Sequence, residues 1–166
     1  MYIRPIEYSD DSQVAELIRS VLTEFGANRP GFAWQDPELE AMTDAYRANN
    51  RVYKVIEVDG AVVGAGGIGP FKCTEYEACC ELQKMYLYPQ FRGQGAGRML
   101  IEELLGDARK MRYEYCYLES LSSMHGALNL YRKQGFINLD QPLGSSGHNS
   151  CDEWMLLDLN AENCLK

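Results

Sequence analysis

The residues best suited to chemistry form one glycine-rich segment, Arg92-Gly93-Gln94-Gly95-Ala96-Gly97-Arg98. Its three glycines stand at alternate positions, and without Cβ atoms they let backbone N–H groups turn toward one point. An amphipathic pattern follows directly, so the first N–H groups and the positive dipole end of a helix face the same point. Because Arg92 and Arg98 add permanent charge on both sides, the segment predicts a pyrophosphate-sized anion site.

A second glycine-rich run matches the dinucleotide-binding pattern letter for letter, Gly64-Ala65-Gly66-Gly67-Ile68-Gly69. The chemistry of that pattern requires a helix to begin at the loop. Here Pro70 follows, and the run lies in the second arm of a hairpin that Asp59 and Gly60 predict. The glycines therefore favour a bent strand or a close backbone contact over a nicotinamide site.

Thiol and imidazole groups give no signal for a metal or a nucleophile. The chain has six cysteines, none in C-x-x-C spacing: Cys73, Cys79, Cys80, Cys116, Cys151 and Cys164. His125 and His148 stand without a metal-spaced partner, and Cys151 near His148 lacks a third residue that could orient it. We therefore expect reduced thiols, no metal site and no thiol nucleophile.

The spacing of apolar residues predicts the helices and strands that must position these residues. One helix begins at a cap formed by Ser9 or Asp10, buries apolar residues spaced by three and four, and ends at Gly26. Further helices are predicted over 37–48, 96–111 and 124–134. Strand patterns cover the segments 2–7, 52–58, 61–68, 79–88, 113–119, 136–139 and 151–158. This mixture of hairpin and crossover connections predicts one α/β domain over residues 1–166.

The bulk properties fit such a domain and restrict its partners. A chain of 166 residues with 46% apolar content can bury a full core. The net charge of −8 argues against nucleic acid as the main partner. Since no apolar run reaches membrane-spanning length and no charged-then-apolar leader is seen, we expect a cytoplasmic protein without a membrane partner.

Two motifs resemble the GNAT superfamily of acyl-CoA-dependent N-acetyltransferases. Arg92–Gly97 satisfies its Q/R-x-x-G-x-G/A pattern, and Ala127–Phe136 satisfies A-x-x-L-Y-x-x-x-G-F. The similarity is specific over residues 80–137. It implies a single-domain α/β (α+β) GNAT-type fold with a mixed central sheet of about seven strands flanked by about four helices. The implied order is a strand, two helices, three strands, a helix, a strand, a helix and two strands.

The resemblance also implies acetyl-CoA (coenzyme A) as co-substrate, without a metal. The strands around 81–88 and 114–119 would run parallel and splay apart, and the 92–98 loop would hold the pyrophosphate. Outside that loop, the residues implied to line the cofactor site are Met85, Tyr86, Leu87, Met124, Ala127 and Tyr131. Unpaired backbone groups on the first strand would bind the pantetheine arm like an added strand. Met124 stands where the family often has a cofactor-contacting asparagine.

The implied activity is direct acetyl transfer to a primary amine within a ternary complex. Tyr131, in the second motif, would be the general acid that protonates the leaving thiolate. Glu119 lies twelve residues before it, as a catalytic glutamate does in some family members, and would be the general base acting through a water. Glu81, on the neighbouring predicted strand, is the other candidate for the base.

A non-catalytic acyl-CoA-binding or sensing module is the alternative function. Such a module would keep the phosphate loop and could lose the acid and the base. The sequence leaves open whether the acceptor is a small molecule, an amino acid or a peptide or protein amine. It also leaves open the length of the acyl group and the oligomeric state, with which a homodimer is compatible.

Overall fold

The computed structural model describes residues 1–144, 147 and 149–161. The strands are β1 (Tyr2–Pro5), β2 (Val52–Val58), β3 (Ala61–Pro70), β4 (Cys79–Leu87), β5 (Tyr115–Ser120), β6 (Ile137–Leu139) and β7 (Glu153–Asp158). The α-helices are α1 (Asp11–Glu24), α2 (Met42–Ala45), α3 (Ala96–Lys110) and α4 (His125–Lys133). The predicted α/β class and the predicted order of elements are confirmed.

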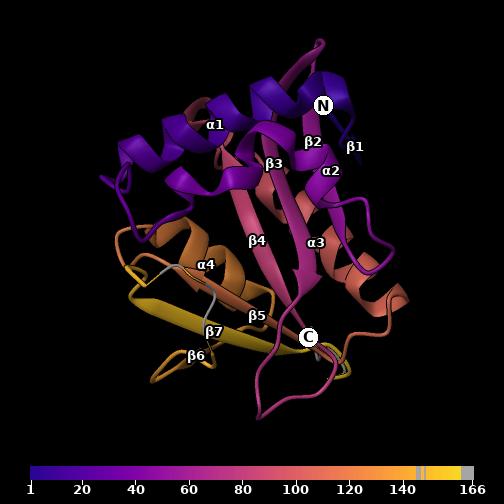
Figure 1. Cartoon of the computed structure of the whole chain (residues 1–166), viewed down its shortest axis with the longest axis vertical. Coiled ribbons are helices and arrows are strands. Elements are labelled where there is room, and N and C mark those ends of the chain that lie inside the picture. The colour runs from indigo at the N-terminus through magenta and orange to yellow at the C-terminus, as the bar shows by residue number, and fades with distance from the viewer. Residues whose placement is uncertain (145–146, 148, 162–166) are drawn as a thin grey trace.

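The strands form one mixed sheet in the order β1-β2-β3-β4-β5-β7-β6. Its central neighbours β4 and β5 are parallel, whereas the other neighbouring pairs are antiparallel. The parallel pairing joins only Cys79–Glu81 to Tyr115–Tyr117. Beyond these residues the two strands diverge, as Figure 1 shows, which confirms the predicted splay.

Helices cover both faces of the sheet. Helices α3 and α4 bury one apolar cluster against it, and α1 and α2 bury a second cluster against the opposite face. Figure 1 shows α1 across the upper ends of strands β3 and β4, with α2 to the right of β3. Within the described ranges, no helix combines the length and the apolar content that a membrane span needs.

The Gly64–Gly69 run lies inside β3, where the strand continues to Pro70 and no helix begins. A Cβ on Gly67 would collide with the ring of Tyr53 and lie 2.7 Å from the carbonyl oxygen of Val52. The glycines therefore allow close packing within the sheet, which confirms that this run is not a dinucleotide loop.

Two local predictions were wrong. The carboxylate of Asp10 does not cap α1, because it accepts hydrogen bonds from the Arg4 guanidinium and from the backbone N–H of Glu7. The helix predicted over 37–48 is a 3₁₀ turn, Pro37–Ala41, followed by the short α2. Helical spacing over so few residues does not distinguish these two forms.

Candidate active site

A groove of about 480 Å³ lies between β4, the start of α3, α4 and the end of α1. Many residues singled out in the sequence line it: Met85, Tyr86, Leu87, Arg92, Gly93, Gly95, Gly97, Arg98, Met124, Ala127 and Tyr131. Gln94 and Ala96 do not, because the Gln94 side chain donates to the Gln90 carbonyl and Ala96, the first residue of α3, is buried in the core. The groove is also lined by residues that the sequence had not assigned to it, although Leu130 is the leucine of the second motif: Val21, Phe25, Gly126, Asn129, Leu130 and Lys133.

The glycine loop turns into α3 through two left-handed residues. Gly93 has φ +73° and Gly95, the residue before the helix, has φ +85°. This backbone presents the first N–H groups of α3, which have no partner within the helix, to the groove. A Cβ on Gly97 would lie 3.2 Å from Leu130 of α4, so this glycine lets α3 and α4 approach each other.

The two arginines of the loop differ in their surroundings. Arg92 forms a bidentate ion pair with Glu24 at the end of α1, with distances of 2.7 and 2.8 Å, and also donates to the Leu87 carbonyl. The charge of Arg92, which was predicted to flank the anion site, is therefore matched within the protein while the residue lines the groove. The side chain of Arg98 is 68% exposed, and its Nε lies 3.6 Å from Oε1 of Glu102, which is a long ion pair.

A second, smaller pocket of about 60 Å³ continues from the groove between the diverging ends of β4 and β5. Four residues line both cavities: Met85, Tyr86, Met124 and Tyr131. These residues mark the junction at which a molecule in the groove could meet one in the pocket. Leu22 and Phe32 from the α1 side close the pocket opposite the strands.

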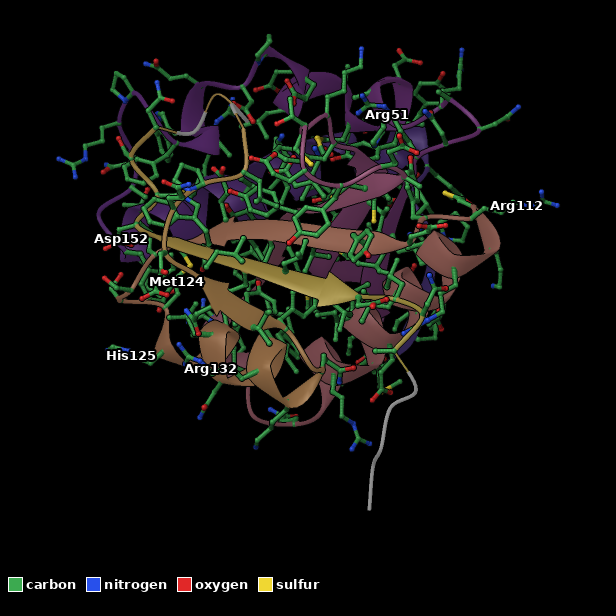
Figure 2. The ribbon with its side chains drawn as sticks, turned by 90° about the horizontal axis from the view of Figure 1, so that it is seen from below. Arg51, Arg112, Met124, His125, Arg132 and Asp152 are labelled. Atoms are coloured by element: carbon green, nitrogen blue, oxygen red, sulfur yellow. The ribbon has the colours of Figure 1, made fainter. Side chains whose placement is uncertain are left out.

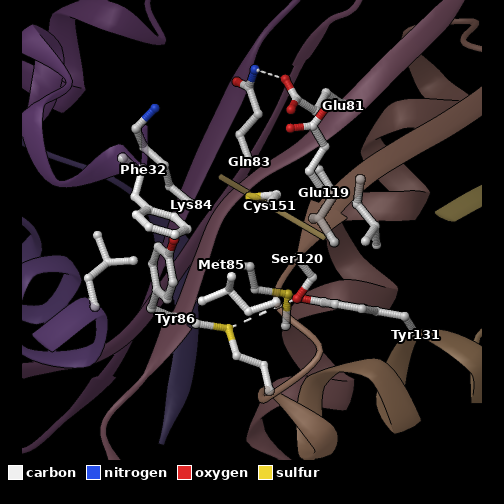
Figure 3. Close-up of a pocket in the computed structure, with 16 residues that line it drawn as sticks. Phe32, Glu81, Gln83, Lys84, Met85, Tyr86, Glu119, Ser120, Tyr131 and Cys151 are labelled. Atoms are coloured by element: carbon white, nitrogen blue, oxygen red, sulfur yellow. Dashed lines mark hydrogen bonds between the residues drawn. The ribbon is translucent and has the colours of Figure 1, made fainter. Parts of the chain in front are cut away.

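Both candidate bases line this pocket. Glu81 of β4 is 7% exposed, and its carboxylate accepts a 2.6 Å hydrogen bond from the Gln83 amide. Glu119 of β5 accepts a 2.8 Å hydrogen bond from the Tyr117 hydroxyl. Figure 3 shows both carboxylates at the upper edge of the pocket. The structure thus brings together the pair of glutamates that the sequence left as alternatives.

Tyr131 extends from α4 toward the junction of the two cavities, and Figure 3 shows its ring directed at Ser120. The residue is 7% exposed. Burial, and then the nearby Cys116 thiol, raises the pKa of Tyr131 well above its usual value. The hydroxyl therefore stays protonated at neutral pH and can donate a proton or a hydrogen bond.

The backbone N–H of Met124, the residue before α4, donates to the Leu121 carbonyl of the preceding loop at 2.9 Å. Asp152 accepts hydrogen bonds from the backbone N–H and the hydroxyl of Ser122, at 2.7 and 2.6 Å. Figure 2 shows Met124 near Asp152 at one end of the sheet, with Arg112 at the other. The Met124 sulfur lies 4.0 Å from the Ser120 hydroxyl oxygen, so a thioether occupies the position where the family often has an amide.

Further pocket residues carried no sequence motif. Gln83 could have been found from its position two residues after Glu81 on a strand, which puts both side chains on one face. Lys84 reaches Asp36 and Glu38 at 2.7 and 2.8 Å, contacts that join a loop to β4 and have no local pattern. Cys151 also lines the pocket.

The thiols and imidazoles add no nucleophile or metal centre that the structure describes. Burial, followed by the nearby Glu119 charge, raises the pKa of Cys151 to about 12, so this thiol is protonated at neutral pH. Among the described residues, no three His, Cys, Asp or Glu side chains come together in a way that could hold a metal. His148 and Cys164 lie outside the described residues.

Comparisons with known proteins agree with this geometry. Residues 15–136 match the model of the Acetyltransferase (GNAT) family. The chain is 37% identical to the uncharacterized N-acetyltransferase YjgM of Escherichia coli (strain K12), over 95% of this chain and 94% of YjgM. A GNAT-family acetyltransferase from Staphylococcus aureus Mu50 has a TM-score of 0.81 at 19% identity, covering 95% of this chain and 98% of the other. YncA of Salmonella typhimurium, solved with its cofactor acetyl-CoA, has a TM-score of 0.73 at 20% identity. The match covers 96% of this chain and 94% of YncA.

Proposed function

Since this chain belongs to the GNAT acetyltransferase family and is an acyltransferase, we propose that it moves an acetyl group from acetyl-CoA to a primary amine. The transfer takes place directly, with both substrates bound. The acceptor is a small molecule, an amino acid or a peptide or protein amine. An acidic chain that uses acetyl-CoA fits a cytoplasmic enzyme.

One observation carries the proposal: the long groove and the small pocket meet at Met85, Tyr86, Met124 and Tyr131. A thioester in the groove and an amine in the pocket would therefore have their reacting atoms at this junction. Holding two reactants together in this way supplies a large part of the rate of a bimolecular reaction.

The groove fits the cofactor in its chemistry and its shape. The N-terminus of α3 and the left-handed Gly95 offer backbone donors for the pyrophosphate. A Cβ on Gly93 or Gly95 would meet no atom within 4 Å, so the space in front of the loop is open for a ligand. Beyond Glu81, β4 no longer pairs with β5. The free edge of this part of β4 would pair with the pantetheine arm through the backbone of Met85 and Leu87.

The pocket supplies the proton transfers that acetyl transfer needs. An amine must lose a proton to attack, and Glu119 or Glu81 would accept it, directly or through a water. The leaving sulfur must gain a proton, and Tyr131 would donate it. The usual pKa values of a thiol and a phenol are about 8.5 and about 10, and burial raises the pKa of Tyr131 further, so this proton transfer is uphill and depends on close positioning.

Incubation of the protein with acetyl-CoA and a panel of amines tests the proposal. Release of free thiol reports turnover, and mass spectrometry of the mixture identifies the acetylated amine. We expect thiol release that depends on the amine. If acetyl-CoA binds and no amine is acetylated, the non-catalytic binding module is the better description.

A further inference from the structure

A chain of two hydrogen bonds ends on the Glu81 carboxylate. The hydroxyl of Tyr46 donates to Oε1 of Gln83 at 2.7 Å, and Nε2 of Gln83 donates to Oε2 of Glu81 at 2.6 Å. Tyr46 follows the last residue of α2 and is 7% exposed. Figure 3 shows the Gln83 amide turned toward Glu81 at the edge of the pocket.

The direction of these two hydrogen bonds follows from the groups that form them. An amide has one accepting and one donating end, so a hydroxyl that donates to Oε1 leaves Nε2 to face Glu81. Burial, and then the charge of Glu81, raises the pKa of Tyr46 far above its usual value, so its hydroxyl stays protonated. An amide N–H that donates to a carboxylate favours the ionised form of that carboxylate.

We infer that Gln83 is a positioning residue, oriented by Tyr46, that holds Glu81 ionised and aimed into the acceptor pocket. The inference rests on the proposed function only for its consequence in catalysis. A base that must take a proton from an amine has to be unprotonated when the amine arrives. By favouring the ionised form, Gln83 would extend to lower pH the range over which Glu81 can accept a proton from an amine.

The backbone around Gln83 leaves room for this arrangement. Gly69 of β3 pairs with Glu81, and a Cβ on Gly69 would lie 2.8 Å from Oε1 of Gln83. A larger residue at this position would push the amide out of line. Lys84, the next residue on β4, has φ +48°, so the strand bulges directly after Gln83.

Other charged and titratable groups lie near Glu81 or near Tyr46. They come from α2 and the segment before β2, from the loop after α1, from β4, from β5 and from the segment before β7: Tyr46, Arg51, Asp36, Glu38, Lys84, Cys116, Tyr117, Glu119 and Cys151. The charge of Lys84 is matched by Asp36 and Glu38. A substitution of Gln83 leaves all these groups in the sequence. A change in the titration midpoint of Glu81 in such a variant is therefore due to the loss of the Gln83 amide.

Gln83→Met keeps a similar length and removes the donor. Carboxyl-carbon NMR of the full chain, with Glu81→Gln to assign the signal, measures the titration midpoint of Glu81. We expect the midpoint in Gln83→Met to rise by about one pH unit, a tenfold change in proton affinity. If Glu81 rather than Glu119 is the base, the acidic limb of kcat/KM against pH should move upward by a similar amount.

Two tyrosine variants control for disturbed packing. Tyr46→Phe removes the hydroxyl that orients Gln83 and should move the Glu81 midpoint in the same direction by a smaller amount. Tyr53→Phe removes a buried hydroxyl that donates to the Lys84 carbonyl and takes no part in the two hydrogen bonds from Tyr46 to Glu81. It should therefore leave the titration midpoint of Glu81 unchanged. If Gln83→Met does not fold, Tyr46→Phe provides the test alone.

The inference is overturned if both Gln83→Met and Tyr46→Phe leave the Glu81 midpoint within about 0.3 pH unit of the wild type. It is overturned equally if Tyr53→Phe moves the midpoint as far as they do. The NMR titration needs no substrate, so it decides the role of Gln83 even if no amine is acetylated. Absence of acetylation would count against the proposed function only.

Discussion

Tyr131 lies where the groove and the pocket join, and burial keeps its hydroxyl protonated. Tyr131→Phe removes one oxygen and little volume. We expect turnover to fall by about 10²-fold, since the leaving thiolate loses its proton donor. Single-turnover consumption of acetyl-CoA, under conditions where the chemical step limits the rate, measures this effect.

A melting temperature close to that of the wild type would show that Tyr131→Phe keeps the fold. Tyr113→Phe is a suitable comparison, because the Tyr113 hydroxyl binds the Asn50 carbonyl far from the pocket. Full turnover in Tyr131→Phe would reduce this residue to a packing role.

The two glutamates of the pocket can be separated by their effect on pH dependence. Glu119→Gln and Glu81→Gln each keep the shape of the side chain and remove its basicity. Loss of the base should lower turnover most near neutral pH and allow partial recovery at high pH, where the amine loses its proton unaided.

The pH–rate profiles of both variants, recorded with the same amine, identify the base. We expect the altered profile in Glu119→Gln. An unchanged profile in Glu119→Gln together with an altered one in Glu81→Gln would transfer the role to Glu81. The hydrogen bonds from Tyr117 to Glu119 and from Gln83 to Glu81 show that both side chains are held in place.

At the scale of elements, the loop before α3 depends on the left-handed Gly95. Gly95→Asp adds backbone strain and a negative charge at the proposed phosphate site. We expect acetyl-CoA affinity to fall at least about tenfold, or about 1.4 kcal/mol, with folding retained. Titration calorimetry measures the change.

Gly95→Asn is the matched control, because asparagine has almost the same shape, tolerates the left-handed region and carries no charge. It should lose less affinity than Gly95→Asp, and the difference between them reports the charge. Equal affinity in the wild type and a folded Gly95→Asp variant would mean that the phosphates bind elsewhere.

At the scale of the whole molecule, one charged cluster ties the N-terminal strand to the rest of the fold. Arg4 of β1 forms ion pairs with Asp10, before α1, and with Glu57 of β2, at 2.6 and 2.8 Å. The Asp10 side chain is 3% exposed. Asp10→Asn weakens this junction, and we expect the free energy of unfolding to fall by about 2 kcal/mol in urea titrations.

The same cluster predicts a dependence on pH. The hydrogen bonds from Arg4 hold the pKa of Asp10 below its ordinary value of 3.8 in the folded state. The stability from Asp10 is therefore complete above about pH 4 and is lost as the pH falls through the folded-state pKa. Asp10→Asn should flatten the acid side of the stability curve.

Asp44→Asn serves as the control for this experiment, because the Asp44 side chain is 56% exposed. Its effect on unfolding should stay within about 0.5 kcal/mol. An acid transition of Asp10→Asn that coincides with that of the wild type would exclude Asp10 as a source of the pH dependence.

The sequence by itself determined the class of the fold, the order of its elements and the position of the glycine loop. These features depend on short-range patterns: left-handed glycines, a two-residue turn at Asp59 and Gly60, and apolar periods of two and 3.6. The resemblance of the two motifs to the GNAT superfamily indicated most of the residues of those motifs that line the groove.

Only the tertiary structure decided how the charges and hydrogen bonds of the site are matched. Arg92 meets Glu24 across 68 positions of the chain, and Tyr46 meets Gln83 across 37. Such contacts arise when β4 separates from β5 and α1 and α2 fold over the gap, which no local pattern encodes. For this reason the sequence named Glu81 and Glu119, and the packing of distant segments put both in one pocket with Gln83.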